Sequence, residues 1–397
     1  MLDHQIESTR QEAVEAILRH YRNWYLPHVM LTPSARFGLY ITAKTLLSRG
    51  DRVLVSPITC RTVIDALLEA GVVPVFVDIE LSTGNIDVSR LSKSVLNNAR
   101  AIITTNLYGS PDAIRDLRFM ANTHKLLLIE DCAHVLRTRV ETRELGTFGD
   151  VSVFSFKKHF DEVGGIICAR DAAHGTRIQG RLIAEGTMPS AQEERLRFCQ
   201  YRLMKATSPS IVRRLSAVYR HLVKVGGHHQ NAEPARDFRS TILNTTFPTI
   251  AALLRVLEFL RRREQLIAAR TAAARTLIAR CPLPMTNGRY NDDVVYLAVP
   301  FFSSNRDAVV GKLRARGIPM YFLYTPPMNV LFPDRTYSVP NLDQDRIDHW
   351  CRHILPVPPQ CGEQFLEVIH QSSALWKTCC ATIADTRHQS QILASNR

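Results

Sequence analysis

One short stretch of the chain carries an acid, a hydroxyl and two amines in an order that could do chemistry. A first apolar run ends in two carboxylates, the second of which is Asp131. A second apolar run contains Ser155 and is followed by Lys157 and Lys158. Buried parallel strands have such continuous apolar runs, and they present polar side chains at their carboxyl ends. The sequence therefore predicts that these groups meet at one edge of a sheet.

These groups match what pyridoxal 5'-phosphate requires from a protein. The cofactor forms a Schiff base with a lysine amine, and a carboxylate at its ring nitrogen keeps that nitrogen protonated as an electron sink. Its phosphate needs hydroxyl and backbone donors. Asp131, Lys158 or Lys157, and Ser155 fill these roles in order. Each residue taken singly indicates only an ordinary α/β strand end, whereas the ordered set favours the cofactor.

The same stretch resembles the fold-type I pyridoxal phosphate enzymes, and most of all the sugar aminotransferase family named after DegT, DnrJ and StrS. Three motifs carry the resemblance: EDCAH at 130–134, GTFGD at 146–150 and FSF at 154–156. In that family the lysine usually lies five residues after the serine, whereas both lysines lie closer to it here. A lysine three residues after the serine is similar to the aspartate aminotransferase loop, which favours Lys158 over Lys157.

A phosphate site is predicted near residue 34. Ser34 is expected to cap a helix, which would place the following amides at a helix N-terminus, where anions bind. The family has a serine-glycine-arginine segment at a similar place to cradle the cofactor phosphate. The resemblance therefore implies phosphate contacts from Ser34, Ala35 and Arg36, and Ala35 can replace the glycine if its backbone is helical.

The resemblance implies four further residues around the cofactor. Thr59 occupies a family position near it, and Asn106 stands where the family usually has histidine and can still donate a hydrogen bond to the phenolic oxygen or to substrate. His134 stands where the family often has glutamine or histidine beside the ring, although a lone loop histidine is as often structural. Asn244 matches an asparagine that the family uses in the active site, commonly across the dimer.

Apolar runs alternate with helical patterns along the chain, which predicts an α/β fold with a parallel sheet and right-handed crossovers. The resemblance implies a fold-type I transferase, with a mainly parallel seven-stranded sheet flanked by helices in a large domain and a small C-terminal α/β domain. We expect an N-terminal helical arm over 1–25, the large domain over 26–248, the small domain with its linking helix over 249–375, and a disordered tail over 376–397. The expected elements include helices over 5–24, 61–69, 88–96, 111–124 and 249–280, and strands over 53–55, 72–77, 101–105, 126–129, 151–156 and 166–169.

Charge leaves several partner classes open. The 397 residues carry a formal net charge of +13, which permits contact with nucleic acid, an anionic membrane or a phosphorylated substrate. No nucleic-acid module is recognisable, so we expect no nucleic-acid partner. A basic helical insertion is expected over about 177–230, with ten Lys and Arg against three Glu between 177 and 224. A solvated helical face and a peripheral membrane contact both account for it.

Composition favours a cytoplasmic enzyme. No apolar stretch approaches the ~20 residues that span a bilayer, and the N-terminus reads as a charged amphipathic helix. The nine cysteines are scattered without a C-x-x-C motif or a zinc-like spacing, which predicts reduced thiols and no metal site.

The resemblance implies transamination by a homodimer with active sites at the subunit interface. The amino donor, most often glutamate in this family, would aminate a nucleotide-linked keto-sugar in cell-surface polysaccharide or secondary-metabolite sugar biosynthesis. Two alternatives remain open. One is a sugar dehydratase of the same fold, in which a histidine, here His159, replaces the lysine. The other is a catalytically silent member that acts as a scaffold or membrane-associated partner.

Overall fold

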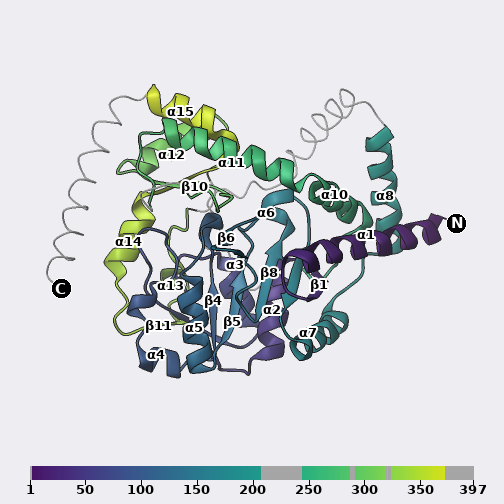
Figure 1. Cartoon of the computed structure of the whole chain (residues 1–397), viewed down its shortest axis with the longest axis horizontal. Helices are drawn as coiled ribbons and strands as arrows, with labels where there is room; N and C mark the ends of the chain where they lie inside the picture. The colour runs from purple at the N-terminus through teal and green to yellow at the C-terminus, as the bar shows by residue number, and fades with distance from the viewer. Residues whose placement is uncertain (1, 207–243, 287–290, 319, 321–322, 372–397) are drawn as a thin grey trace.

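The computed structural model describes residues 2–206, 244–286, 291–318, 320 and 323–371. Within these ranges, a large sheet is flanked by helices, and a second, smaller group of helices surrounds a two-stranded sheet (Figure 1). The expected tail over 376–397 and the part of the expected insertion beyond residue 206 lie outside the described residues.

The large sheet has eight strands among the described residues, in the order β1-β9-β8-β5-β4-β2-β3-β11. β9 runs antiparallel to both of its neighbours and the other pairs are parallel, so the prediction of a mainly parallel sheet is confirmed. The strands are β1 (His28–Thr32), β2 (Arg52–Val55), β3 (Val73–Phe76), β4 (Ala101–Thr104), β5 (Leu127–Asp131), β8 (Val151–Ser155), β9 (Gly165–Ala169) and β11 (Tyr337–Ser338).

The predicted number of strands is wrong by one. The eighth strand, β11, comes from the C-terminal part of the chain and adds to the edge of the sheet, with Tyr337 opposite Val75 and Ser338 opposite Phe76. Both residues of β11 are exposed, so they lack the apolar run that marks a central strand. Only the fold brings this short segment beside β3.

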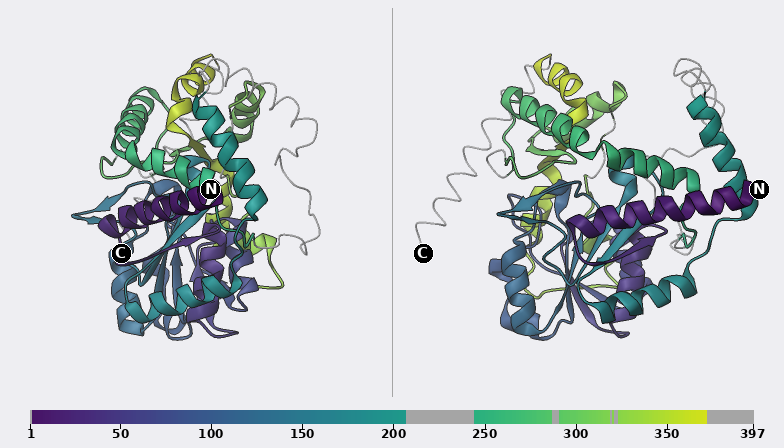
Figure 2. Two further views of the ribbon diagram at one scale, coloured as in Figure 1. Left: turned by 90° about the vertical axis from the view of Figure 1, so that its right-hand side faces the viewer. Right: turned by 45° about the vertical axis from the view of Figure 1, so that its right-hand side comes forward.

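The central strands are apolar on both faces because each face is covered by helices. Leu54 and Leu128 point into one core with α1, α5 and α10, whereas their neighbours Val53 and Ile129 point into the opposite core with α2, α3 and α7. α1 crosses its face of the sheet as one long helix, and α8 lies beside its N-terminal end (Figure 2). These helices are α1 (Leu2–Trp24), α2 (Ala35–Leu46), α3 (Arg61–Glu69), α5 (Ile114–His124), α7 (Ala172–Glu185), α8 (Ala191–Ala206) and α10 (Ile250–Arg261).

Local signals placed several helices correctly. The helix predicted over 61–69 is α3, and Ser34 caps α2 as expected, since its Oγ accepts a hydrogen bond from the Phe37 N–H at 3.1 Å. The helix predicted over 88–96 is wrong in its first half. Residues Val88–Arg90 form a single 3-10 turn instead. Ser92 then caps a separate short helix, α4 (Lys93–Asn97), by accepting a hydrogen bond from the Val95 N–H.

The single helix predicted over 249–280 is also wrong. It is divided at Arg262, whose φ of −104° and ψ of 12° leave the helical range, into α10 and α11 (Arg263–Arg280). Arg263, the first residue after the break, donates to the Leu136 carbonyl at 3.2 Å and lies 4.7 Å from the centre of the Trp24 ring. Tertiary contacts therefore redirect the chain where local helix propensity would have continued it.

The smaller group packs around an antiparallel pair, β10 (Val299–Phe302) and β12 (Ile354–Val357). Phe301 and Phe365 stack in its core, with ring centres 6.1 Å apart. The helices that pack in this core are α11, α12 (Arg306–Ala315) and α15 (Gly362–His370). α13 (Met328–Leu331) and α14 (Gln344–His353) pack in clusters that include Phe76 and Ile58 of the large group.

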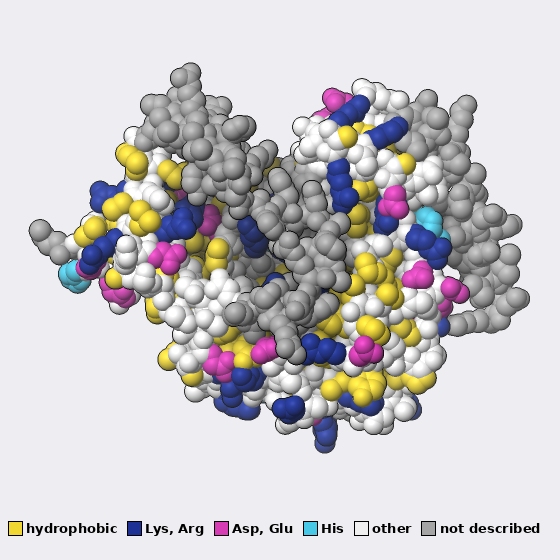
Figure 3. Space-filling model, turned by 180° about the vertical axis from the view of Figure 1, so that it is seen from behind, with side chains coloured by type: hydrophobic (Ala, Val, Ile, Leu, Met, Phe, Trp, Pro, Cys, Tyr) yellow, Lys and Arg dark blue, Asp and Glu magenta, His cyan; other side chains and the backbone are white. Residues whose placement is uncertain are grey.

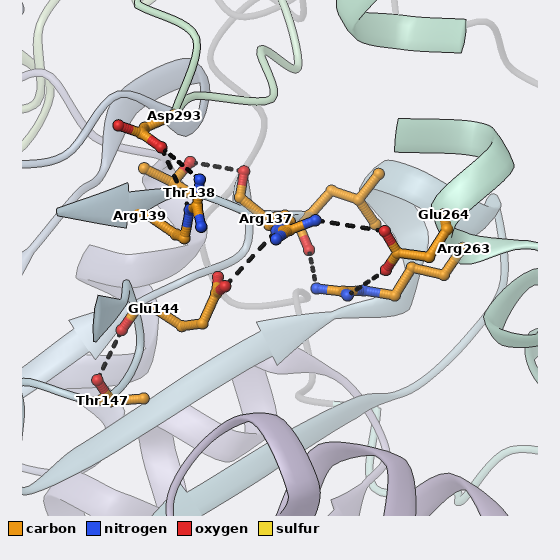
Figure 4. A network of polar contacts seen from close by, with 9 residues as sticks. Arg137, Thr138, Arg139, Glu144, Thr147, Arg263, Glu264 and Asp293 are labelled. Carbon is orange, nitrogen blue, oxygen red and sulfur yellow. Dashed lines mark hydrogen bonds and ion pairs between the residues drawn. The ribbon is translucent and has the colours of Figure 1, made fainter. Parts of the chain in front are cut away.

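Ion pairs join the two groups (Figure 4). Arg137 pairs with Glu144 at 3.5 Å and with Glu264 of α11 at 3.3 Å, while Arg139 pairs with Asp293 at 2.9 Å. Arg139 and Glu144 belong to a small hairpin of β6 (Arg139–Val140) and β7 (Arg143–Glu144). In the chain, this hairpin follows β5 and precedes β8. The loop that follows Asp131 is thus held against the start of α11.

Candidate active site

The carboxylate of Asp131 stands at the carboxyl end of β5, near the middle of the sheet. It is only 7% exposed, and its Oδ1 accepts a hydrogen bond from the Ala133 N–H at 2.9 Å. Burial raises the pKa of Asp131 to about 6, against the lowering effects of that hydrogen bond and of the Lys158 charge. This carboxylate is therefore short of positive partners, and a nearby cation would stabilise its charged form.

The turn after β8 separates the two candidate lysines. α6 (Phe156–Phe160) starts directly after β8, and Ser155 caps it by accepting from the Lys157 N–H at 3.3 Å. Lys157 is exposed and pairs with Asp161 at 2.6 Å. Lys158 is half-buried, and burial lowers its pKa, while its electrostatic interactions with Cys60 and Asp131 raise it. Of the two amines, the one on Lys158 interacts with Asp131.

His134 lies beside this pair as a neutral ring. Its Nδ1 accepts a hydrogen bond from the Tyr108 N–H at 3.1 Å, and the two rings are almost parallel, 8° apart, with centres separated by 6.2 Å. Burial, and secondarily the Lys158 charge, lower the pKa of His134 to about 3. Because Nδ1 is an acceptor, the proton of the neutral ring is on Nε2, which lies 3.5 Å from the Tyr324 hydroxyl.

The start of α2 lies next to the residues that follow Lys158. Ser34 forms a parallel bridge with Gly164, and a Cβ added to Gly165 would lie 2.9 Å from the Ala35 nitrogen. Glycine is needed there because the two backbones approach so closely. Ala35 is the first residue of α2 and has helical geometry, as its replacement of glycine requires. The N-terminus of α2, with half-buried Arg36, is thereby brought to the same sheet edge as Ser155.

Two other predicted residues, Thr59 and Asn106, are buried. Thr59 is buried just before the start of α3. Asn106 is fully buried, and its amide donates to the Thr104 hydroxyl at 2.9 Å and to the Asp131 carbonyl at 3.1 Å. Both amide hydrogens of Asn106 are therefore used inside the protein, where they hold the end of β5.

Asn244 is exposed, and its side-chain oxygen accepts from the Thr246 N–H at 3.0 Å in a local turn. Among the described residues, none of its hydrogen bonds or ion pairs joins it to the Asp131 and Lys158 cluster. Its predicted role across a dimer stays a prediction.

Cys60, Tyr108 and Tyr324 belong to the cluster although the sequence reasoning did not select them. The Cys60 and Asp131 charges, together with Tyr108, add to the burial that raises the pKa of Tyr324. Tyr324 comes from the loop before α13, far along the chain, and its ring centre lies 6.3 Å from that of Tyr108. Tyrosines in the NLYG and YTPP segments were visible in the sequence, but only packing brings them together.

The donor set suits pyridoxal phosphate. Asp131 is a buried carboxylate with a raised pKa, and a protonated ring nitrogen beside it would lower that pKa again. Lys158 supplies an amine with a lowered pKa. The N-terminus of α2 supplies backbone N–H groups for a phosphate. The neutral, planar ring of His134 lies beside them and could face a flat heterocycle. The residues present therefore fit the group that the sequence predicted.

Comparison with known proteins agrees with this geometry. Residues 8–195 match the model of the DegT/DnrJ/EryC1/StrS aminotransferase family. The chain is 32% identical over 130 residues to GDP-perosamine synthase of Vibrio cholerae, covering 32% of this chain and 35% of that protein. It is 30% identical over 137 residues to GDP-4-keto-6-deoxy-D-mannose 3-dehydratase of Escherichia coli O55:H7, covering 34% and 35%. The matched segments thus span about a third of the length of these curated relatives.

The likeness in structure extends further. A DegT DnrJ EryC1 StrS aminotransferase from Brucella abortus superposes with a TM-score of 0.66, covering 93% of this chain and 96% of that one, at 18% sequence identity. At this identity the likeness shows the fold, which is the fold-type I arrangement that the sequence predicted. The segment of this chain that is similar to the DegT/DnrJ/EryC1/StrS aminotransferase family, residues 8–195, contains Asp131, Ser155 and Lys158.

Proposed function

We propose that this protein is a pyridoxal phosphate-dependent aminotransferase that moves an amino group from glutamate to a keto-sugar nucleotide, in polysaccharide or secondary-metabolite sugar biosynthesis. The observation that carries the proposal is the interaction of the buried Asp131 carboxylate with the half-buried Lys158 amine, where β5 and β8 end. The family match and relatives such as GDP-perosamine synthase support the substrate class.

In this proposal Asp131 holds a proton at the ring nitrogen of the cofactor, which when bound supplies the electron sink for removing a proton from the carbon beside an amine. Lys158 anchors the cofactor and then moves that proton, because a lowered pKa makes a larger share of its amine available as a base. His134 supports one face of the ring. Ser34, Arg36 and Ser155 bind the phosphate, and Thr59 lines the site.

The test uses the purified protein loaded with the cofactor. We expect visible absorbance from the lysine-linked form, loss of that absorbance with glutamate, and its return with an accepted nucleotide keto-sugar. Mass spectrometry of a keto-sugar panel would then show a product in which an amino group replaces the ketone oxygen. Absence of lysine-linked absorbance, and of trapping by borohydride, would overturn the proposal and favour a silent scaffold.

A dehydratase is the second candidate, because His159 follows Lys158 directly and one relative is a sugar 3-dehydratase. The geometry favours the aminotransferase. His159 Nδ1 accepts from Arg270 Nη1 at 2.8 Å, whereas it is Lys158 whose charge acts on Asp131 and His134. A product that has lost a hydroxyl, with no amino group gained, would reverse this choice.

A homodimer with shared active sites is part of the proposal. The exposed position of Asn244 leaves it able to reach a second copy of the chain. If each site takes Asn244 from the partner, mixing a Lys158→Ala chain with an Asn244→Ala chain should restore part of the activity, since some mixed dimers hold one intact site. Light scattering should show twice the chain mass. A monomer, or no recovery on mixing, would argue against shared sites. A cytoplasmic location likewise stays a prediction.

Peripheral membrane contact is proposed for the described part of the insertion. α8 exposes Leu196, Leu203 and Met204 among exposed basic residues that include Arg197 and Arg202. In Figure 3, which shows the molecule from behind, apolar and basic side chains lie together on the left, the side on which α8 lies in this view. None of the helices in the described ranges is long and apolar enough to cross a membrane. Apolar and basic side chains together are typical of a helix that lies on an anionic surface.

Sedimentation with anionic vesicles tests this contact. We expect binding at low salt that weakens as salt rises, because screening acts over ~8 Å at physiological ionic strength. The double change Arg197→Glu and Arg202→Glu should remove it. The same charge reversal on α12, Lys312→Glu and Arg314→Glu, should not. No sedimentation at any salt would indicate an ordinary solvated helix.

A further inference from the structure

Arg270 of α11 carries a charge that the proposed chemistry has not used. Its guanidinium lies behind the Lys158 turn, where Nη1 contacts His159 Nδ1 at 2.8 Å. Within the described residues, no carboxylate lies within ion-pairing distance of it, and burial alone lowers its pKa. Arg270 is half-buried, and its guanidinium has five N–H donors. Withdrawing such a charge from water without an anionic partner costs free energy.

The buried arginines of the described chain all have an anionic partner. Arg10 pairs with Glu194, Arg263 pairs with Glu264, and Arg306 pairs with Asp307. Arg270 instead meets a neutral ring, because burial and then the Arg270 charge hold the pKa of His159 well below its usual range. His159 can orient the guanidinium but cannot neutralise it.

The position of Arg270 indicates which kind of anion it could bind. His159 directly follows Lys158 in α6, and Arg270 contacts His159, so Arg270 lies next to the turn that carries the reacting amine. Among the described residues, the half-buried or buried charged groups here include the cations of Lys158 and Arg270 and the carboxylate of Asp131. An amino donor carries its carboxylate one bond from the reacting carbon, whereas the diphosphate of a sugar nucleotide is separated from a reacting ring carbon by the sugar.

We propose that Arg270, oriented by His159, binds a carboxylate of the amino donor. The planar fork of arginine forms two parallel hydrogen bonds with a carboxylate, which a lysine cannot do. Arg270 is then a specificity residue for the donor half of the reaction, and His159 is a positioning residue. This inference rests on the proposed aminotransferase function.

Titration calorimetry on the cofactor-loaded protein tests the site with two probes, glutarate and inorganic diphosphate. Arg270→Gln should weaken glutarate binding about tenfold or more, because a charge-assisted pair is lost, and should leave diphosphate binding unchanged. Arg270→Lys keeps the charge but not the planar fork. Its affinity for glutarate should lie between that of the unaltered protein and that of Arg270→Gln. Arg275→Gln, an exposed change on the same helix, should bind both probes as the unaltered protein does.

A second measurement separates the donor from the sugar nucleotide. Arg270→Gln should slow the reaction with glutamate at low donor concentration, with the same limiting rate, and should not change the reaction of the aminated enzyme with keto-sugar nucleotide. If Arg270→Gln weakens only diphosphate binding and the reaction with keto-sugar nucleotide, the proposal is overturned in favour of a phosphate site. Unchanged binding of both probes would overturn it outright.

Failure of the proposed function gives a different result. If the unaltered protein fails to react with glutamate but binds glutarate through Arg270, the carboxylate site stands and the aminotransferase proposal falls. Folding of each variant is checked by circular dichroism. We expect Arg270→Gln to unfold at a higher temperature than the unaltered protein without glutarate, since an uncompensated charge has been removed. If Arg270→Gln unfolds first, Arg270 is structural and the proposal is wrong.

Discussion

At the scale of single residues, the site depends on how burial changes the charge states of neighbouring groups. Asp131 is held with a raised pKa, Lys158 with a lowered one, and His134 as a neutral ring. Burial disfavours the usual charged forms of this carboxylate and this amine. A ligand with a suitably charged group would stabilise them, as is common at functional sites. Residue-level predictions follow from these opposite shifts.

The first concerns the lysine. Lys158→Ala should abolish the absorbance of the lysine-linked cofactor and lower turnover by several orders of magnitude, because the anchor and the base are the same amine. Lys157→Ala should retain both, since Lys157 is exposed and paired with Asp161. Absorbance spectra before and after borohydride reduction measure the difference. The reverse pattern would mean that the α6 turn presents the other amine.

The second concerns Asp131 and pH. Its folded pKa of about 6 lies above the ordinary value of 3.8, so between these values the folded state binds more protons than the unfolded state. The free energy of unfolding therefore falls as pH rises from about 4 to about 6, by roughly 3 kcal/mol at most. Asp131→Asn removes this cost. In urea titrations the cofactor-free variant should be more stable than the unaltered protein above pH 6 and equal to it below pH 4.

The same Asp131→Asn change should slow turnover of the loaded enzyme by several orders of magnitude, because a neutral amide cannot hold the ring proton. A gain in stability together with a loss of activity is expected of a functional carboxylate. Equal turnover, or lower stability above pH 6, would contradict the assignment.

At the scale of elements, Glu130 holds the loop that leads into β8. Its carboxylate is fully buried and accepts hydrogen bonds from the N–H groups of Gly146, Phe148 and Gly149 at 2.8, 2.7 and 2.5 Å. Gly146 has a φ of +99°, and a Cβ there would lie 2.6 Å from the Phe154 ring. The EDCAH and GTFGD motifs are thus two halves of one contact.

The third prediction tests this contact. Glu130→Gln replaces one acceptor oxygen with a donor that faces backbone N–H groups, and should lower the free energy of unfolding by about 1 to 3 kcal/mol. Thermal unfolding measures the loss. Glu141→Gln, an exposed change in the same loop, is the control and should have little effect on stability. Equal stability of the Glu130 and Glu141 variants would show that the loop does not depend on the buried carboxylate.

At the scale of the whole molecule, the N-terminal helix binds distant segments together. Arg10 of α1 pairs with Glu194 of α8 and donates to the Pro248 carbonyl at 2.9 Å. Glu194 also accepts from the Ile250 N–H at 2.8 Å, at the start of α10. A buried ion pair therefore fixes α1, the insertion and the linking helix to one another.

The fourth prediction is a double-mutant cycle on this pair. Either single change, Arg10→Met or Glu194→Gln, should cost about 3 kcal/mol or more, because each leaves its buried partner uncompensated. The double variant should lose less than the sum of the two. Urea unfolding measures the energies, and limited proteolysis should show earlier cleavage near α1 in the single variants. Strictly additive losses would show that the pair has no coupling.

Much of the fold followed from local sequence. The apolar runs of β2 and β5, the Ser34 cap and the full extent of α3 were readable because strand burial, capping and helix periodicity act over a few residues. The order of acid, hydroxyl and amine in one stretch was enough to predict the cofactor, since β5 and β8 are adjacent in the sheet.

Tertiary structure alone decided the rest. Which lysine faces Asp131 depends on the direction of a single turn after β8, and the break at Arg262 depends on a carbonyl and a ring far away in sequence. The edge strand β11, the approach of Tyr324 to His134 and the contact of Arg270 with His159 are likewise set by packing between distant segments. The sequence by itself determined most of the elements and pointed to the proposed chemistry, because those depend on neighbours along the chain. The surroundings of each group, and hence its charge, depend on neighbours in space.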